Sequence, residues 1–129
     1  MSENSVRVMV VDDVPDAAET LALMLELDGY CVRMAHDGAQ AMAMIDSFDP
    51  HCILFDVDMP GIDGLELSKR VRARHDNDIV LIAVTARQIQ DPRVAGAFNV
   101  ADHYFSKPVD HALLRKVLPP LHAQTGPAS

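Results

Sequence analysis

Five polar side chains of chemically useful types stand at or just after the ends of short apolar runs. They are Asp12, Asp13, Asp56, Thr85 and Lys107. If the runs are parallel strands, these side chains meet at one edge of the sheet, because the carboxyl ends of parallel strands lie together. Three carboxylates held close together repel one another unless a cation neutralises them, and an all-oxygen set suits a hard divalent ion. The pattern therefore predicts a Mg²⁺ site.

Asp56 is the candidate nucleophile of this group. It ends the central apolar run, shortly before the turn expected at Pro60-Gly61. A metal ion and Lys107 would screen its charge, while Thr85 would hydrogen-bond an oxygen of an incoming phosphoryl group. Each of these residues has a simpler explanation when taken alone, such as a helix cap, a turn or a solvated charge. Their coincidence at successive strand ends favours phosphoryl transfer.

Elements of two kinds must position these side chains. Strands are predicted at 6–11, 30–35, 52–55, 79–84 and 103–105. Helices are predicted at 15–28, 38–48, 63–74, from an Asp91 cap and Pro92 onward, and at 110–118. The first helix is expected to bury the face that carries Ala17, Leu21, Met24 and Leu25. Near-continuous apolar strands joined by helical crossovers predict a doubly wound α/β domain with a parallel sheet.

Composition narrows the class of protein. The chain has 129 residues, a formal net charge of −8 and 49% hydrophobic residues. This length suits one domain, and the acidic balance argues against direct nucleic-acid binding, which needs clustered Lys and Arg. No apolar run approaches the roughly 20 residues that cross a bilayer, so we expect a cytoplasmic protein without membrane contact. Cys31 and Cys52 each lie inside an apolar run and are expected to be small buried hydrophobes, and the six histidines lack zinc-site spacing.

Four motifs follow one another along the chain: "VVDDVPD", "ILFDVDMPGIDG", "VTA" and "YFSKP". As a set they resemble the receiver domains of response regulators, over residues 6 to about 118. The resemblance implies the flavodoxin-like fold, with a five-stranded parallel sheet of order 2-1-3-4-5 and five helices. It also implies a single receiver domain over 1–129, with its core at 6–118 and a mobile tail at 119–129.

The resemblance assigns a phosphotransfer role to Asp56. This residue would take a phosphoryl group from a histidine kinase or a histidine phosphotransfer protein, in a reaction that depends on Mg²⁺ or Mn²⁺. Asp12, Asp13, Asp56 and the backbone carbonyl of Asp58 would hold the metal, and Thr85 and Lys107 would hold the phosphoryl group. Such a domain catalyses only its own phosphorylation and dephosphorylation, so it is not expected to be an enzyme with a separate substrate.

A conformational switch is implied as well. Phosphorylation of Asp56 would draw Thr85 inward and let the ring of Tyr104 turn from exposed to buried. The face made by the fourth helix, the fifth strand and the fifth helix would then change shape, which is a shift between two packings. We expect an unknown output partner to bind this face, and the domain itself to be a monomer or a weak homodimer.

The sequence departs from the family pattern at two places. Val100 stands in "NVAD" where the family usually has glycine, so Asn99 is expected to take the left-handed turn one residue early. Arg87 stands two residues after Thr85, opposite Asp58 in this family. An Asp58–Arg87 ion pair would shield the acyl phosphate from water, whereas an unpaired Asp58 would orient water and shorten its lifetime.

Other readings stay open at this point. The Asp56-x-Asp58 motif also occurs in haloacid dehalogenase-type phosphatases, where both aspartates are chemical. In that family the nucleophile follows the first strand, and here it follows the third. A receiver fold used as a phosphorylation-independent scaffold is a further reading. The chain is either a stand-alone regulator or a receiver from a longer protein such as a hybrid histidine kinase.

Overall fold

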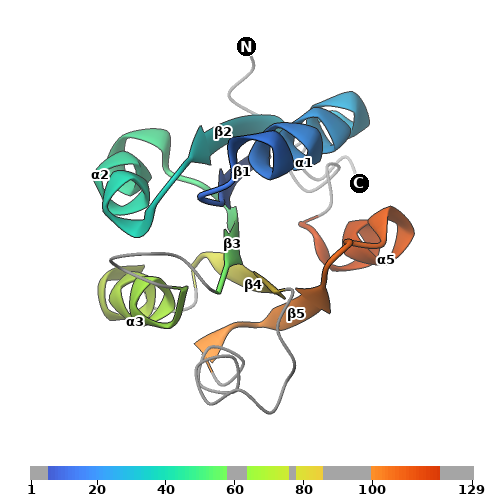
Figure 1. Cartoon of the computed structure of the whole chain (residues 1–129). Coiled ribbons are helices and arrows are strands. Elements are labelled where there is room, and N and C mark those ends of the chain that lie inside the picture. Colours follow the sequence, from blue (N-terminus) through green and yellow to red (C-terminus); the bar gives the residue numbers. More distant parts are fainter. Residues whose placement is uncertain (1–5, 58–63, 76–77, 86–99, 120–129) are drawn as a thin grey trace, which may run out of the picture.

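Five parallel strands form the sheet of the computed structural model, which describes residues 6–57, 64–75, 78–85 and 100–119. The strand order is β2-β1-β3-β4-β5, as predicted (Figure 1). The bounds are Arg7–Val11 for β1, Cys31–Ala35 for β2, Cys52–Asp56 for β3, Val80–Thr85 for β4 and His103–Ser106 for β5. β1, β3 and β4 each pair on both sides, which explains why their sequences are nearly continuous runs of apolar residues.

Four helices lie in the described part of the chain. They are α1 (Pro15–Asp28), α2 (Gly38–Phe48), α3 (Gly64–His75) and α5 (His111–Val117), and the predicted fourth helix from Pro92 falls outside it. The bounds predicted for α1 and α2 are confirmed. α1 has Pro15 in its first turn and ends at Gly29, whose φ of 109° is a left-handed conformation that suits glycine. Asp37 caps α2 by accepting a hydrogen bond from the Gln40 amide.

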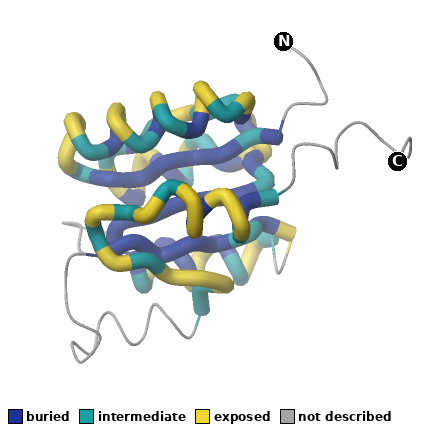
Figure 2. Tube along the Cα trace, turned by 90° about the vertical axis from the view of Figure 1, so that its right-hand side faces the viewer, coloured by how far each residue is buried: buried dark blue, intermediate teal, exposed yellow. Residues whose placement is uncertain are grey.

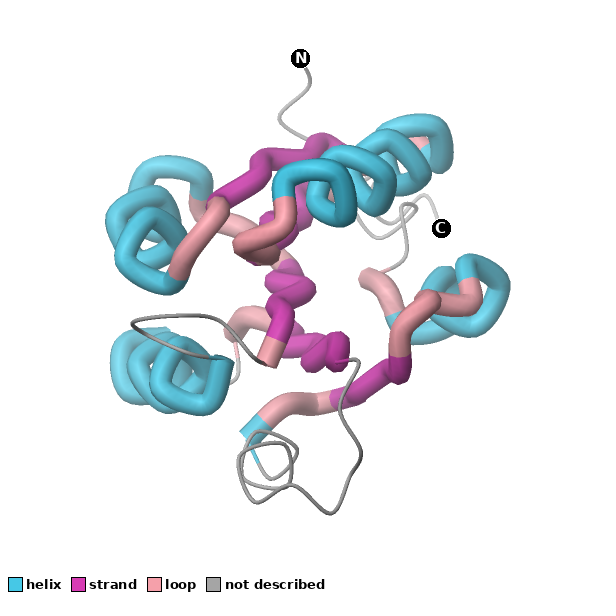
Figure 3. Tube along the Cα trace, viewed as in Figure 1, coloured by secondary structure: helices cyan, strands magenta, loops and turns pink. Residues whose placement is uncertain are grey.

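Two helical layers cover the sheet. In Figure 1, α2 and α3 lie on the left of the strands and α1 and α5 on the right, and Figure 3 shows the strands as one layer between them. Strand residues alternate between the two faces. Met9, Val11, Ile53, Phe55 and Leu81 pack with Ile45, Leu67 and Val71. Val8, Val10, Leu54, Ile82 and Val84 pack with Ala18, Leu25 and Leu114. Figure 2 shows the buried strands beneath helices whose outer turns are exposed.

The buried face of α1 differs from the prediction. Ala18, Ala22 and Leu25 are the buried residues of this helix. Of the predicted set, Leu25 is confirmed, whereas Ala17, Leu21 and Met24 are only half-buried. An apolar face on an Ala- and Leu-rich helix is wide enough to bury Ala18 and Ala22 in place of Ala17, Leu21 and Met24.

Arg72 of α3 joins three backbone segments near the edge of the sheet. Its guanidinium donates to the carbonyl oxygen of Ile79 at 2.9 Å, to that of Val100 at 3.3 Å, and to the Asp102 carboxylate at 2.7 Å. Asp102 in turn accepts the Leu81 amide at 2.8 Å. Val100 is helical and packs against the core on the α2–α3 side. The side chain that replaces the family's usual glycine is therefore accommodated, while Asn99 lies outside the described residues.

The two cysteines are free thiols. Cys52 is buried in β3, and burial raises the pKa of its thiol. Cys31 is half-buried in β2, so the expectation of buried hydrophobes is confirmed fully for Cys52 and partly for Cys31. Among the described residues, no helix has the length and apolar character needed to cross a membrane.

Candidate functional site

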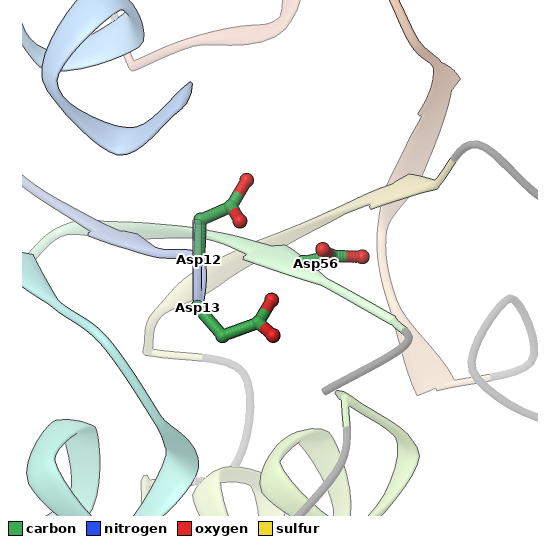
Figure 4. Close-up of side chains that lie close together, drawn as sticks. All are labelled: Asp12, Asp13 and Asp56. Carbon is green, nitrogen blue, oxygen red and sulfur yellow. The ribbon is translucent and has the colours of Figure 1, made fainter. Parts of the chain in front are cut away.

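Three carboxylates meet at the carboxyl edge of the sheet. Asp12 and Asp13 follow β1, and Asp56 ends the neighbouring strand β3, as Figure 4 shows. One carboxylate oxygen from each residue lies within 4.8 Å of the others. Asp12 and Asp56 are only 7% and 8% exposed, so their charges are not dispersed by water. This donor set, made of closely spaced carboxylate oxygens, fits a hard divalent cation such as Mg²⁺.

Lys107 supplies a positive charge to the same group. Its ammonium donates to Asp12 Oδ2 at 3.0 Å and to Asp56 Oδ2 at 3.3 Å. Burial alone would lower the pKa of Lys107, but the hydrogen bond to Asp12 and the charges of Asp56 and Asp12 outweigh it, so the pKa is raised. The side chain is therefore a protonated ammonium at neutral pH. The predicted meeting of Lys107 with the acidic cluster is confirmed.

The backbone fixes where these carboxylates lie. The Asp12 amide continues the β1–β2 ladder by donating to the Ala35 carbonyl, and Asp12 Oδ1 accepts the Val14 amide at 2.9 Å. Asp12 thus holds the loop before α1, although the helix cap itself is Val14 and has no side-chain cap. Asp56 is opposite Val84 in the register of β3 with β4.

Gly64 sets the distance between α3 and the end of β3. Its amide donates to the Val57 carbonyl at 3.0 Å. A Cβ added at Gly64 would lie 2.6 Å from the Val57 Cα and 2.8 Å from the Asp56 carbonyl oxygen. Our reading of the sequence missed this residue. The available signal was a glycine near the start of the helix predicted at 63–74, which follows Asp56 and the turn expected at Pro60-Gly61.

Thr85 and Tyr104, the predicted switch residues, lie on the adjacent strands β4 and β5. Thr85 ends β4 and is only 1% exposed, while Tyr104 in β5 is 47% exposed. Tyr104 pairs with Ala83, two residues before Thr85, so the two side chains lie on the same face of the sheet. Asp58 and Arg87 fall outside the described residues, and their predicted roles in metal binding and phosphate lifetime stay predictions.

An apolar cavity of about 760 Å³ opens onto the acidic cluster from the α1–α5 side. Ala17, Leu21 and Met24 of α1 form one wall, and Pro108 and Val109 form another. Asp12, Asp56 and Lys107 line its polar end. No pattern in the sequence indicated this cavity, because its lining comes from residues far apart in the chain, from Val10 to Val109.

Comparison with known proteins agrees with this geometry. The family model for the response regulator receiver domain matches residues 8–119. Response regulator MprA of Mycobacterium tuberculosis (strain H37Rv) is 41% identical over 123 residues, which are 89% of this chain and 53% of that protein. MprA of Mycobacterium ulcerans is 43% identical over 104 residues, 81% of this chain and 44% of that protein. The chain therefore spans about half the length of the curated relatives it matches.

Solved structures show the same fold. A CheY-like receiver domain protein from Methanospirillum hungatei has a TM-score of 0.81 at 28% identity, with 94% of this chain and 97% of that chain covered. The response regulator TrrA of Thermotoga maritima, solved in complex with Mg(2+)-BeF, has a TM-score of 0.76 at 30% identity. The alignment covers 86% of this chain and 94% of TrrA.

Proposed function

Because the chain belongs to the family of response regulator receiver domains, we propose that Asp56 accepts a phosphoryl group from a phosphohistidine. The observation that carries the proposal is the Asp12–Asp13–Asp56 cluster with Lys107 bonded to Asp12 and Asp56. The donor would be a histidine kinase or a histidine phosphotransfer protein. The family assignment also favours a signalling domain over the haloacid dehalogenase-type phosphatase suggested by Asp56-x-Asp58.

The proposed reaction moves one phosphoryl group. A carboxylate oxygen of Asp56 attacks phosphorus, the bond from phosphorus to the histidine nitrogen breaks, and that nitrogen keeps the electron pair. A Mg²⁺ ion held by Asp12, Asp13 and Asp56 would neutralise charge on the transferred oxygens. Lys107, already at Asp56 and protonated, would pair with a phosphoryl oxygen, and the hydroxyl of Thr85 would donate to another. In dephosphorylation, water attacks phosphorus and the Asp56 carboxylate leaves.

The switch is part of the same proposal. When Thr85 turns toward the phosphoryl group, it vacates space on the face of the sheet that Tyr104 shares. The exposed ring of Tyr104 could then become buried, which would change the surface around β5 and α5. This surface would bind the output partner. Asp58 and Arg87 are proposed to set how long the phosphate lasts, with an ion pair between them shielding it from water.

The test uses the purified chain, acetyl phosphate as donor, and either Mg²⁺ or a chelator. We expect one phosphoryl group per chain in Mg²⁺, stable in acid and released by hydroxylamine, and none in Asp56→Asn. Asp49→Asn is the matched control, because Asp49 is an exposed carboxylate with a φ of 53°, a conformation that asparagine tolerates. Equal labelling of Asp56→Asn and wild type would refute the assignment. Turnover of p-nitrophenyl phosphate by wild type would instead support the phosphatase.

A further inference from the structure

The cavity beside the acidic cluster lies between α1, the sheet and the segment that leads into α5. Its body is apolar, with Leu21 and Met24 on the α1 side, Leu54 and Val84 on the sheet side and Val109 on the loop before α5. Its volume of about 760 Å³ lies within the range of roughly 300–1,000 Å³ that is typical of small-molecule sites. Leu21 and Met24 are only half-buried, so these apolar side chains still have surface that a ligand could cover.

Polar contacts lie near both ends of the cavity. At the sheet edge, Lys107 bonds to Asp12 and Asp56 at 3.0 and 3.3 Å. Beyond Met24, at the last residue of α1, the Asp28 carboxylate lies 2.6 Å from His111 Nε2 and 3.9 Å from Arg115 Nε. The Asp28 contacts link the end of α1 to α5, and the Lys107 contacts link the loop after β5 to the ends of β1 and β3.

The charge at the polar end selects the ligand. Asp12, Asp16 and Asp56 line this end with three carboxylates, against the single ammonium of Lys107. Asp16 is exposed in the first turn of α1, where it offsets the partial positive charge of the helix N-terminus. The excess negative charge attracts a cation and repels an anion. We propose that the cavity binds a small amphiphilic amine, with its apolar body between α1 and the Pro108–Val109 segment and its ammonium at Asp16 and Asp12.

One consequence rests on the proposed function. An ammonium at Asp12 and Asp16 lies beside the carboxylates that would hold Mg²⁺, so the amine and the metal should oppose each other. Since phosphorylation of Asp56 is expected to need Mg²⁺, the amine would also slow it. The binding measurements below use neither a phosphodonor nor phosphorylation. The results of these binding measurements would therefore stand even if Asp56 were not phosphorylated.

The experiment compares three probes that share one ring system. In chelator, 2-naphthylmethylamine, 2-naphthylmethanol and 2-naphthoate are titrated into the whole chain by calorimetry. We expect the amine to bind about tenfold more tightly than the alcohol, the alcohol to bind measurably, and the carboxylate to bind most weakly. Saturating Mg²⁺ should weaken binding of the amine and leave the affinity for the alcohol unchanged. Equal affinities for amine and alcohol, or tightest binding of the carboxylate, would overturn the charge assignment.

Variants locate the binding. Ala17→Phe fills the cavity and should abolish binding of amine and alcohol, while Leu23→Phe on the exposed side of the same helix should not. Met24→Trp serves the same purpose if Ala17→Phe fails to fold, as judged by circular dichroism. Asp16→Asn should reduce the affinity for the amine about tenfold, and Glu19→Gln should leave it unchanged. If binding persists in both cavity-filling variants, the probes bind elsewhere and the proposal is wrong.

Discussion

Replacement of Gly64 by alanine tests how tightly α3 is held against the end of β3, where the proposed phosphoacceptor Asp56 lies. The added Cβ would start 2.6 Å from the Val57 Cα and must reach at least 3.0 Å, so the backbone next to Asp56 has to move by about 0.4 Å. Overpacking of this kind costs about 1–3 kcal/mol, and the better helix propensity of alanine returns up to about 1 kcal/mol. We expect the Gly64→Ala variant to be less stable by about 1–2 kcal/mol.

Two measurements check this reasoning. Urea denaturation gives the free energy of unfolding, and labelling by acetyl phosphate in Mg²⁺ gives the rate at Asp56. We expect that rate to fall about tenfold, since a shift of a few tenths of an ångström misplaces the nucleophile. Ala39 is exposed in the first turn of α2, so the Ala39→Gly variant measures how much the difference in helix propensity between alanine and glycine changes the free energy of unfolding. If Gly64→Ala keeps both the stability and the labelling rate of wild type, close approach at Gly64 does not position Asp56.

Four further predictions concern Lys107, the two cysteines and Arg72. Lys107→Met should lose about 2–3 kcal/mol of unfolding free energy in chelator, because it leaves buried carboxylates uncompensated, and Mg²⁺ should stabilise it more than wild type. Since the pKa of Lys107 is raised above its ordinary 10.5, its stabilising contribution in wild type should be complete at neutral pH and fade only as the pH rises through the folded-state pKa. Cys31 should react with a thiol reagent before Cys52, because the Cys52 thiol is buried and has a raised pKa. Fast labelling of Cys52 in the folded Cys31→Ser variant would contradict this. Arg72→Lys should lower the free energy of unfolding in urea by about 2 kcal/mol, because one ammonium cannot reach the carbonyls and the carboxylate that the guanidinium bridges. The control Arg70→Lys, at an exposed position of the same helix, should change it by less than about 0.5 kcal/mol.

Local signals account for the elements that were predicted well. Pro15 and Gly29 mark the two ends of α1, and Asp37 marks the start of α2, because each residue satisfies a backbone requirement of its own. The apolar runs gave the strands, and their parallel order brought Asp12 and Asp56 together at one edge. Those features depend on neighbours in sequence or on a general rule of α/β sheets.

Other features depend on packing between distant elements. The buried face of α1 could not be predicted, since Ala17 and Ala18 are equally apolar and the choice between them depends on how the whole helix packs on the sheet. The need for a glycine at position 64 likewise comes from the backbone of β3. The bridging contacts of Arg72 involve carbonyl groups, which no side-chain pattern reveals.

α5 is attached to the domain by few contacts. Leu114 is its buried side chain, with Leu118 just beyond it, and polar links run from Asp28 to His111 and from the Tyr30 hydroxyl to the Pro119 carbonyl at 3.0 Å. Elements with little buried apolar surface open at a lower free energy than the global unfolding of the protein. We therefore expect α5 to behave as a separate foldon, whose amide hydrogens exchange with solvent while those of β1 and β3 stay protected. The native ensemble would then include a minor state in which the sheet is intact and one of its faces is partly uncovered.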